Sequence, residues 1–458
     1  MAERSDRLVS LDVFRGMTIA GMVLVNNPGT WSAIYGPLKH AEWHGITPTD
    51  YIFPFFLFIV GVAVPIAFSK RIASGVTRDT YIKIVTRSAT IFAVGLLMSA
   101  IPFFNFAETA IPYALKILIV LGYSAALFFY LWDKVKLSLV IAGVTAGLVT
   151  VFWLSGYTVV PYNVGTMRIP GVLQRIAVCY LFVALIYLHT NWKQQSIIAA
   201  ALLLIYWFLM TLVPVPGCEV WTIDDKACNL AAWLDRAILT ENHIWRAGKV
   251  FDPEGILSTI PAIVTCLSGV LAGTWLRSGP PALAGGQEFT GDPSNSEVES
   301  RPPAYAGGTD KAAGLFFAGT VAIAVGWAWS LLFPLNKSLW TSSYVVYTTG
   351  LALLTLGTCY WLIDVKGYKR WAWPFVVFGV NALALFVFSG IFARLIGMIR
   401  VAGPDAGKEI TLQQWIFSNL FLSWASPINA SLAYAISFIL LWLFLMWLLY
   451  RKRIYIKV

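Results

Sequence analysis

About twelve apolar segments, each of roughly 17–25 residues, follow one another along the chain and restrict its fold more than any other feature. Each is long enough to cross ~30 Å of hydrocarbon as an α-helix. Hydrophobic residues make up 58% of the chain and charged residues 12%, and a water-soluble domain cannot bury so much apolar surface. The sequence therefore predicts an all-α fold, a polytopic transmembrane helix bundle of about twelve spans. The expected spans are approximately residues 12–33, 50–69, 84–101, 112–131, 138–155, 170–188, 195–213, 255–276, 312–333, 341–363, 372–396 and 429–450.

The net charge of +10 raises the question of nucleic-acid binding, but the distribution of the basic residues points to membrane orientation instead. With the N-terminus inside, the short connections on the cytoplasmic side hold most of the lysines and arginines, which is the positive-inside pattern. We therefore expect a multi-pass protein with both termini in the cytoplasm and no nucleic-acid partner. The polar start of the chain carries no cleavage site, so the first span is predicted to be a retained signal anchor. The basic residues concerned are Arg4, Arg7, Lys70, Arg71, Arg78, Lys83, Lys134, Lys136, Lys193, Lys366, Lys369, Arg370, Arg451, Lys452, Arg453 and Lys457.

Two long polar segments interrupt the row of spans. Residues 214–253 are expected outside the membrane and ordered, and Cys218 and Cys228 within them predict a disulfide in an oxidising compartment. Residues 279–311 are rich in Gly, Pro, Ser and Glu and predict a flexible cytoplasmic linker. The linker divides the chain into a first membrane bundle of about eight spans, residues 1–278, and a second of about four, residues 312–458.

Two of the four histidines, His40 and His44, lie in the short connection between the first two spans. An imidazole titrates near neutrality, so it suits proton transfer or the carriage of an acyl group, although a solvated interfacial histidine is the simpler interpretation. Asp50 starts the second span and either orients the His40 ring or complements the helix dipole. Asn26 ends the first span, where its amide either holds a carbonyl or an imidazole or caps the helix.

Arg15 lies three residues after Asp12 at the cytoplasmic edge of the first span. The two side chains form an interfacial ion pair, or the arginine offers its planar fork of donors to a phosphate. Gln174 and Arg175 lie about one turn inside the span 170–188. An intramembrane arginine is costly and is usually paired or functional.

Asp252 and Glu254 flank Pro253 where the eighth span begins, with the proline expected in the first helical turn. The two carboxylates either cap this helix or accept hydrogen bonds from an amine or a sugar hydroxyl. Asn336 and Asn381 are polar residues in apolar surroundings, where asparagine often joins helices. The chain has no phosphate-binding loop and no cysteine- or histidine-rich ligand pattern, so no metal site is expected.

Six stretches carry a family resemblance, and they occur in one order over most of the chain: Asp12–Gly16, Val25–Trp43, Asp50–Phe58, Arg168–Arg175, Asp252–Leu257 and Asn336–Trp340. Together they resemble the heparan-α-glucosaminide N-acetyltransferase family of membrane acetyltransferases, which includes bacterial members sometimes named as N-acetylglucosamine transporters. The resemblance implies that acetyl-CoA is the cytosolic co-substrate and that the acetyl group reaches an amino sugar across the membrane.

In this resemblance the active-site histidine falls on His40 and its companion asparagine on Asn26, and the family also has paired cysteines in the loop that carries Cys218 and Cys228. Two departures are expected. The chain lacks the large lumenal N-terminal domain of the lysosomal enzymes, and residues 104–155 form two additional spans. These features favour a bacterial inner membrane, leave the acceptor undefined, and leave a homodimer open.

On the donor side, the resulting hypothesis places the phosphates of acetyl-CoA at Arg15 and its pantetheine arm in a tunnel lined by Gln174 and Arg175. The thioester would then reach His40, which deprotonates the attacking amine or first takes the acetyl group itself.

On the acceptor side, Asn26 would donate to the developing oxyanion, while Asp50, Asp252 and Glu254 orient the imidazole or the sugar. The alternative is an amino-sugar transporter without chemistry, against which the absence of an internal repeat counts. A polysaccharide O-acetyltransferase would differ only in its acceptor.

Overall fold

The computed structural model describes residues 8–73, 75–278, 306–403 and 407–456. Within these ranges the chain is mostly helical with almost no strand, as expected for the all-α class. The main helices are α1 (Val9–Asn26), α2 (Ile52–Ala73), α3 (Arg78–Ser99), α4 (Tyr113–Leu131), α5 (Val135–Leu154), α6 (Val172–His189), α7 (Trp192–Leu212), α8 (Leu230–Leu239), α9 (Thr259–Arg277), α10 (Ala306–Ser330), α11 (Ser342–Cys359), α12 (Trp373–Val380), α13 (Ala382–Met398), α14 (Leu412–Ile416) and α15 (Pro427–Arg451). The other elements are a hairpin of β1 (Arg400–Ala402) and β2 (Glu409–Thr411), three short 3₁₀ turns at Gly36–Leu38, Pro48–Tyr51 and Val164–Thr166, and two π-helical turns at Tyr360–Val365 and Phe417–Phe421.

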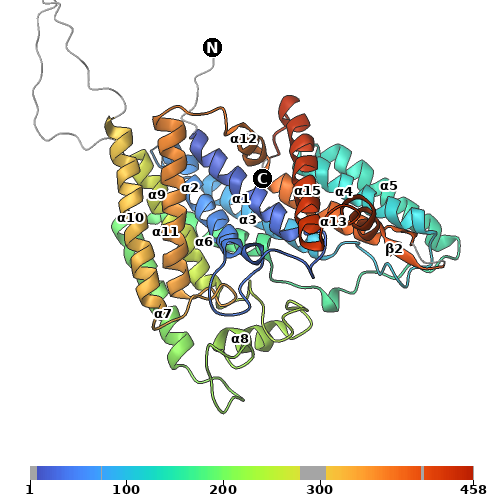
Figure 1. Cartoon of the computed structure of the whole chain (residues 1–458), viewed down its shortest axis with the longest axis horizontal. Helices are drawn as coiled ribbons and strands as arrows, with labels where there is room; N and C mark the ends of the chain where they lie inside the picture. The colour runs from blue at the N-terminus through green and yellow to red at the C-terminus, as the bar shows by residue number, and fades with distance from the viewer. Residues whose placement is uncertain (1–7, 74, 279–305, 404–406, 457–458) are drawn as a thin grey trace, which may run out of the picture.

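Eleven of the described helices are long and apolar enough to cross a membrane, and the number becomes twelve when α12 and α13 count as one span. The prediction of a polytopic bundle is therefore confirmed, and the protein is a multi-pass membrane protein. In Figure 1, α10 and α11 stand at one side of the bundle, α4 and α5 at the other, and α1 between them.

The expected span at 372–396 is not one straight helix, because α12 and α13 are bent by 81° at a break between them. Asn381 lies at the break and is fully buried. Its amide donates to the carbonyl of Ile454 (3.0 Å) and accepts from the backbone N–H of Ile456 (2.8 Å). The break is thus stabilised by the segment after α15, a partner that a local hydropathy pattern does not reveal.

The first span also ends earlier than expected, at Asn26 instead of residue 33. Asn27 donates from its side chain to the carbonyl of Val23 (2.8 Å), which satisfies one of the exposed carbonyls at the helix end. Pro28 then follows, and a proline cannot continue the hydrogen-bond ladder.

Small residues allow the central helices to approach closely. A Cβ added at Gly16 of α1 would lie 1.8 Å from the carbonyl oxygen of Phe375 in α12. One added at Gly61 of α2 would lie equally close to the carbonyl oxygen of Cys266 in α9. Glycine is needed at both crossings, as in other tightly packed membrane helices.

The two expected bundles are not separate in space. α12 packs against α1, and α11 packs against α2 and α9, so helices from both parts of the sequence share one bundle. The expected linker 279–311 lies for the most part outside the described residues, and its last part, from Ala306 onward, already belongs to α10.

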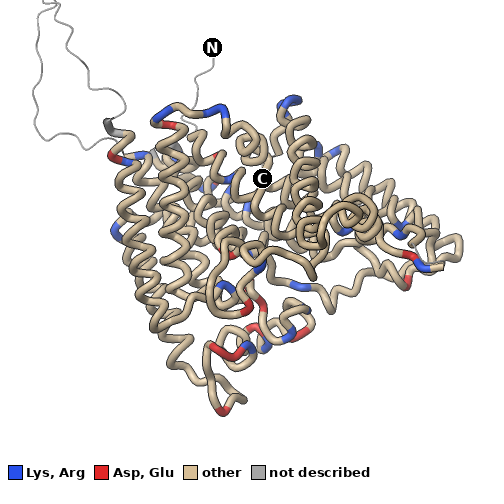
Figure 2. Tube along the Cα trace, viewed as in Figure 1, with Lys and Arg blue, Asp and Glu red and all other residues tan. Residues whose placement is uncertain are grey.

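The two ends of the bundle differ in charge (Figure 2). Lysine and arginine residues gather at the end that holds the α11–α12 connection and the end of α15, whereas many of the aspartate and glutamate residues lie around α8 at the opposite end. The long segment around α8 is ordered, as expected. The predicted disulfide between Cys218 and Cys228 is present in it.

Candidate active site

The connection between α1 and α2 carries His40 at the end of the bundle near α8 (Figure 1). Two neighbouring loops hold it in place. The indole N–H of Trp43 donates to the carbonyl of Ile223 in the α8 segment (2.9 Å), and the backbone N–H of Gly45 donates to the carbonyl of Leu335 in the α10–α11 connection (2.8 Å). Three segments far apart in the sequence therefore meet at this histidine.

His40 and Asp50 form an imidazole–carboxylate pair, with Nδ1 2.7 Å from Oδ1. The His40 side chain is 48% exposed, while that of Asp50 is 1% exposed. The second oxygen of Asp50 accepts from the backbone N–H groups of Ala41 (3.1 Å) and Thr47 (3.0 Å) and from the Thr47 hydroxyl (3.0 Å). One buried carboxylate therefore fixes both the ring and the loop that carries it. Because a carboxylate only accepts, Nδ1 of His40 donates to Asp50, and in the neutral ring the lone pair is then on Nε2.

Lys337 completes the cluster from the α10–α11 connection. Its Nζ lies 3.0 Å from Nδ1 and 3.1 Å from Nε2 of His40, and 3.7 Å from Oδ1 of Asp50. Burial lowers the pKa of Lys337, while the charges of Asp50 and Glu254 act to raise it. A cation held at this point can stabilise negative charge that develops next to the imidazole.

A second imidazole–carboxylate pair lies beside the first. Nε2 of His44 is 2.8 Å from Oδ1 of Asp224, and its Nδ1 is 3.3 Å from the amide nitrogen of Asn336. Both ring nitrogens thus contact protein groups, and Asp224 belongs to the α8 segment. His44 therefore joins two loops, whereas His40 pairs with Asp50 and Lys337 and has the more exposed side chain of the two.

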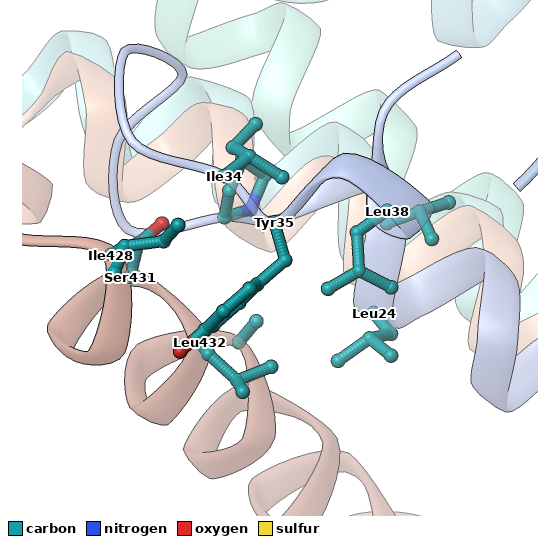
Figure 3. A pocket seen from close by; sticks show the side chains of 10 residues that line it. Leu24, Ile34, Tyr35, Leu38, Ile428, Ser431 and Leu432 are labelled. Carbon is teal, nitrogen blue, oxygen red and sulfur yellow. The ribbon is translucent and has the colours of Figure 1, made fainter. Parts of the chain in front are cut away.

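Asn26 is the predicted companion of His40. Its side chain is exposed and makes no hydrogen bond with the described residues. Beside it, the end of α1 packs against α15 around Tyr35, whose hydroxyl donates to Asn429, with Leu24 and Leu432 close by (Figure 3). The space left there is about 10 Å³, enough for one water at most. It is a packing gap beside Asn26 and too small for a substrate.

Asp252 and Glu254 are held by Arg168. The guanidinium donates to both oxygens of Asp252 (2.9 and 2.6 Å) and to Glu254 (2.5 Å). Burial lowers the pKa of Arg168, but the hydrogen bonds and charges of the two carboxylates outweigh this effect and raise it. Asp252 also accepts from the backbone N–H groups of Trp245 (2.8 Å) and Glu254 (2.9 Å). Its contacts are with protein groups, so its geometry is that of a structural ion pair.

The expected helix start at Pro253 is wrong, because α9 begins only at Thr259. The preceding residues form a turn closed by the N–H of Gly255, which donates to the carbonyl of Asp252 (3.0 Å). A Cβ at Gly255 would lie 2.0 Å from the carboxylate of Asp235 in α8. The ion pairs of Asp252 and this close approach hold the segment outside the helix.

Gln174 and Arg175 lie in the first turn of α6, and both are buried. Nη2 of Arg175 donates to the carbonyl of Gly255 (3.1 Å) and to the hydroxyl of Ser258. The guanidinium also lies over the ring of Trp340, at 5.1 Å. Both residues line a cavity of about 590 Å³.

Arg15 lies far along α1 from this cluster, toward the opposite end of the bundle. Its Nη1 donates to Asp12 (3.2 Å) and to the carbonyl of Gly379 in α12 (3.4 Å). The helix rises 1.5 Å per residue, so Arg15 and Asn26 are separated by about 16 Å along its axis. The predicted ion pair with Asp12 is therefore present, and Arg15 remains a candidate only for a ligand at that end.

The sequence of this chain is similar to those of known acetyltransferases. A family model described as heparan-alpha-glucosaminide N-acetyltransferase, catalytic, matches residues 7–162. The human heparan-alpha-glucosaminide N-acetyltransferase is 26% identical over 503 aligned residues, which cover 99% of this chain and 60% of that protein. The mouse enzyme is 24% identical over 501, covering 99% and 61%.

This chain is similar to the heparan-alpha-glucosaminide N-acetyltransferases over nearly its whole length. The resemblance predicted from the sequence stretches is thereby confirmed. The chain spans about 60% of the length of the curated relatives it matches. The range matched by the acetyltransferase model contains Asn26, His40 and Asp50. It also contains α4 and α5, the two spans within residues 104–155 that were expected to be additional to the family.

The structure brings together only part of the predicted acetyltransferase site. His40 and Asp50 are in contact, whereas Asp252, Glu254, Gln174 and Arg175 form a neighbouring group around the start of α9. Lys337 was not singled out from the sequence. A signal for it existed, since it lies in one of the matching stretches and is a lysine on the side that the predicted topology places away from the cytoplasm, where lysine is disfavoured.

Proposed function

We propose that the protein is an N-acetyltransferase that moves acetyl from cytosolic acetyl-CoA to the amine of a glucosamine-type sugar on the opposite side of the membrane. The observation that carries the proposal is the His40–Asp50 pair with Lys337 against the ring. A buried carboxylate on Nδ1 leaves Nε2 as the basic nitrogen, which is the arrangement that general-base catalysis requires. Relationship to known N-acetyltransferases favours this chemistry over sugar transport.

In this mechanism Nε2 of His40 takes a proton from the sugar amine as the nitrogen attacks the thioester carbonyl. The carbon–nitrogen bond forms, the carbon–sulfur bond breaks, and coenzyme A leaves as the thiol after taking up the proton. Alternatively, Nε2 first accepts the acetyl group from the thioester and then passes it to the amine. Both routes use the same nitrogen and the same orienting carboxylate, Asp50.

Lys337 stabilises the negative oxygen of the tetrahedral intermediate. Its partial burial makes the ammonium more effective than it would be in water, because the local dielectric is lower. Asn26 is the second proposed donor to this oxygen, from the exposed end of α1. Glu254 lies near enough to influence the charge of Lys337 and would orient the sugar.

Acetyl-CoA would enter from the end of the bundle where Arg15 lies, with its phosphates near that guanidinium. The position of Gln174 and Arg175 along the path of the pantetheine arm stays a prediction. We further propose that this end is cytoplasmic, with both chain termini, and that the membrane is a bacterial inner membrane. The basic end of the bundle supports this orientation (Figure 2). The number of protomers is left open.

The decisive experiment is acetyl transfer from radiolabelled acetyl-CoA to glucosamine by purified protein. The variants are His40→Ala, His44→Ala as the matched control, and Lys337→Met. Loss of a general base lowers turnover by about 10²–10⁴-fold, so we expect that loss for His40→Ala. Loss of one oxyanion donor lowers it by about 10²–10³-fold, which is the result expected for Lys337→Met.

His44→Ala should retain most of the wild-type activity, because that ring joins the α8 segment to the α10–α11 connection, which is a structural contact. Full activity of His40→Ala would remove the catalytic assignment. Absence of product from every protein, with glucosamine and with short amino-sugar oligomers, would favour the transporter and lead to uptake assays in liposomes.

A further inference from the structure

A cavity of about 590 Å³ lies between α3, α6, α7 and α9. Its outer end, toward α8, is lined by Leu239 of α8 and by Glu254–Ile256 before α9. Its inner end reaches Ile186 of α6 and Ile198 of α7. From Gln174 to Ile186 the wall follows α6 for about 18 Å, which is more than half of the hydrocarbon thickness.

The two ends of the cavity differ in chemistry. At the outer end, Nε2 of Gln174 and Nε and Nη1 of Arg175 are buried without a hydrogen-bond partner among the described residues. Glu254 lies beside them, and its carboxylate is shared with Arg168. Buried polar atoms without partners are uncommon and indicate a group that binds there. This end is suited to the hydroxyl and amine groups of a sugar.

The remainder of the wall is apolar and includes Phe92, Val178, Phe182 and Leu202. A pantetheine arm contains two amides, and each amide costs free energy when it is buried without a hydrogen-bond partner. A hydrocarbon chain carries no such group and gains from every methylene that it buries. The long inner part of the cavity therefore fits an alkyl chain better than the arm of coenzyme A.

The polar end of the cavity is adjacent to the His40 cluster. Arg175 lies over the ring of Trp340, and the N–H of Trp340 donates to the carbonyl of Lys337 (3.2 Å). Trp340 also packs against Tyr344 at 5.3 Å, and the Tyr344 hydroxyl donates to the carbonyl of Asp50 (2.6 Å). A head group at the outer end would thus lie next to the residues proposed for catalysis.

We propose that this cavity binds the hydrocarbon chain of the acceptor, so that the amino sugar that is acetylated is the head group of a membrane amphiphile. The chain lies along α6 and α7, and the sugar contacts Glu254 together with Gln174 and Arg175, in place of the pantetheine arm that the sequence predicts at these two residues. This inference rests on the proposed acetyl transfer and names its acceptor class.

The first test compares glucosamine with butyl, octyl and dodecyl β-glucosaminide as acceptors, with the protein in phosphatidylcholine nanodiscs. Leu202→Phe narrows the cavity, and Leu204→Phe is the control, because it adds the same ring on the same helix at an exposed position that does not line the cavity. We expect Leu202→Phe to raise the KM for the dodecyl compound about tenfold while leaving that for glucosamine unchanged. Leu204→Phe should change neither KM value. This result separates binding in the cavity from partition of the dodecyl compound into the bilayer.

The second test does not depend on catalysis. A dodecyl glucosaminide with a diazirine at the end of its chain is photolysed in the nanodiscs, and the labelled peptides are identified by mass spectrometry. We expect labelling near Ile186 and Ile198, reduced by Leu202→Phe and unaffected by acetyl-CoA.

Uniform labelling of lipid-facing helices would overturn the inference, and so would loss of labelling when acetyl-CoA is added, because the cavity would then hold the donor. Labelling at Ile186 and Ile198 without acetyl transfer would support the cavity as an amphiphile site and count against the proposed enzyme activity. Acetyl transfer in which Leu202→Phe and Leu204→Phe change the KM equally would support the proposed enzyme activity and count against the cavity as the amphiphile site.

Discussion

At the scale of single residues, Asp50 is the position on which the candidate site depends most. One oxygen contacts His40, and the other accepts three hydrogen bonds from Ala41 and Thr47. The same carboxylate therefore sets the tautomer of the ring and the conformation of its loop. Asp224 contacts His44 in a similar way but is exposed, so it offers a matched comparison.

We expect Asp50→Asn to lower the turnover of acetyl transfer by about 10²–10⁴-fold, as loss of the base itself would. An asparagine amide replaces one acceptor oxygen with a donor, which then faces either the N–H groups of the loop or Nδ1 of His40. Steady-state kinetics beside Asp224→Asn measures the effect. Equal activities of the two variants, at equal thermal stability, would show that the carboxylate at Asp50 does not orient a catalytic imidazole.

Asp235 is a second buried carboxylate, and it is expected to make stability depend on pH. Burial raises its pKa to about 7, from a usual value of 3.8, although the N–H of Ile256 acts to lower it. Between these two pKa values the unfolded chain has lost this proton and the folded protein still holds it. The free energy of unfolding therefore falls as the pH rises from about 4 to about 7.

Asp235→Asn removes this ionisation. The apparent Tm of the variant in detergent should therefore rise relative to that of the wild type as the pH increases from about 4 to about 7. The gain should level off above about pH 7, where the wild-type carboxylate is ionised in both states. Melting curves at several pH values, followed by tryptophan fluorescence, provide the measurement, with the exposed Asp133→Asn as the control. A Tm difference that stays constant with pH would contradict the assignment.

At the scale of elements, the break between α12 and α13 depends on a single side chain. Asn381 uses both its amide donor and its carbonyl oxygen on the segment that follows α15. Two backbone groups of that segment are thereby satisfied inside the bundle, where a missing partner is costly. The C-terminal segment and the broken helix therefore stabilise each other.

We expect Asn381→Leu to lower the free energy of unfolding by about 2–4 kcal/mol, since it leaves two buried backbone groups unsatisfied. A chain that ends at Arg453 should lose a similar amount. Because both changes remove the same hydrogen bonds, the double variant should be no less stable than the weaker single variant. Apparent Tm values of the four proteins test this, and additive losses would mean that the two elements are independent.

At the scale of the whole molecule, the sequence alone predicts the helices and residue pairs that depend on residues close together in the chain. Each apolar run long enough to span the bilayer predicts a helix, and His40 and Asp50 are near enough in sequence to be paired by inspection. The break at Asn381 depends on Ile454 and Ile456, and the contact of His40 with Lys337 joins residues almost 300 positions apart. Such contacts follow from packing of the bundle, which hydropathy and motif spacing do not describe.

Orientation is the property of the whole molecule on which transfer across the membrane depends. The proposal requires His40 to face away from the cytoplasm and the basic α11–α12 connection to face it. Glu42 and Lys369 are exposed residues in these two segments, and the cysteines outside the disulfide are buried, so a single introduced cysteine can be labelled over a low background.

In intact bacterial cells, we expect Glu42→Cys to react with a membrane-impermeant maleimide and Lys369→Cys to react only after permeabilisation. The reason is the distribution of lysine and arginine, which retains the basic connections on the cytoplasmic side. Labelling is read by the mass shift of the purified protein. The reverse pattern would place His40 on the same side as acetyl-CoA, and transfer would then need no passage of the acetyl group across the bilayer.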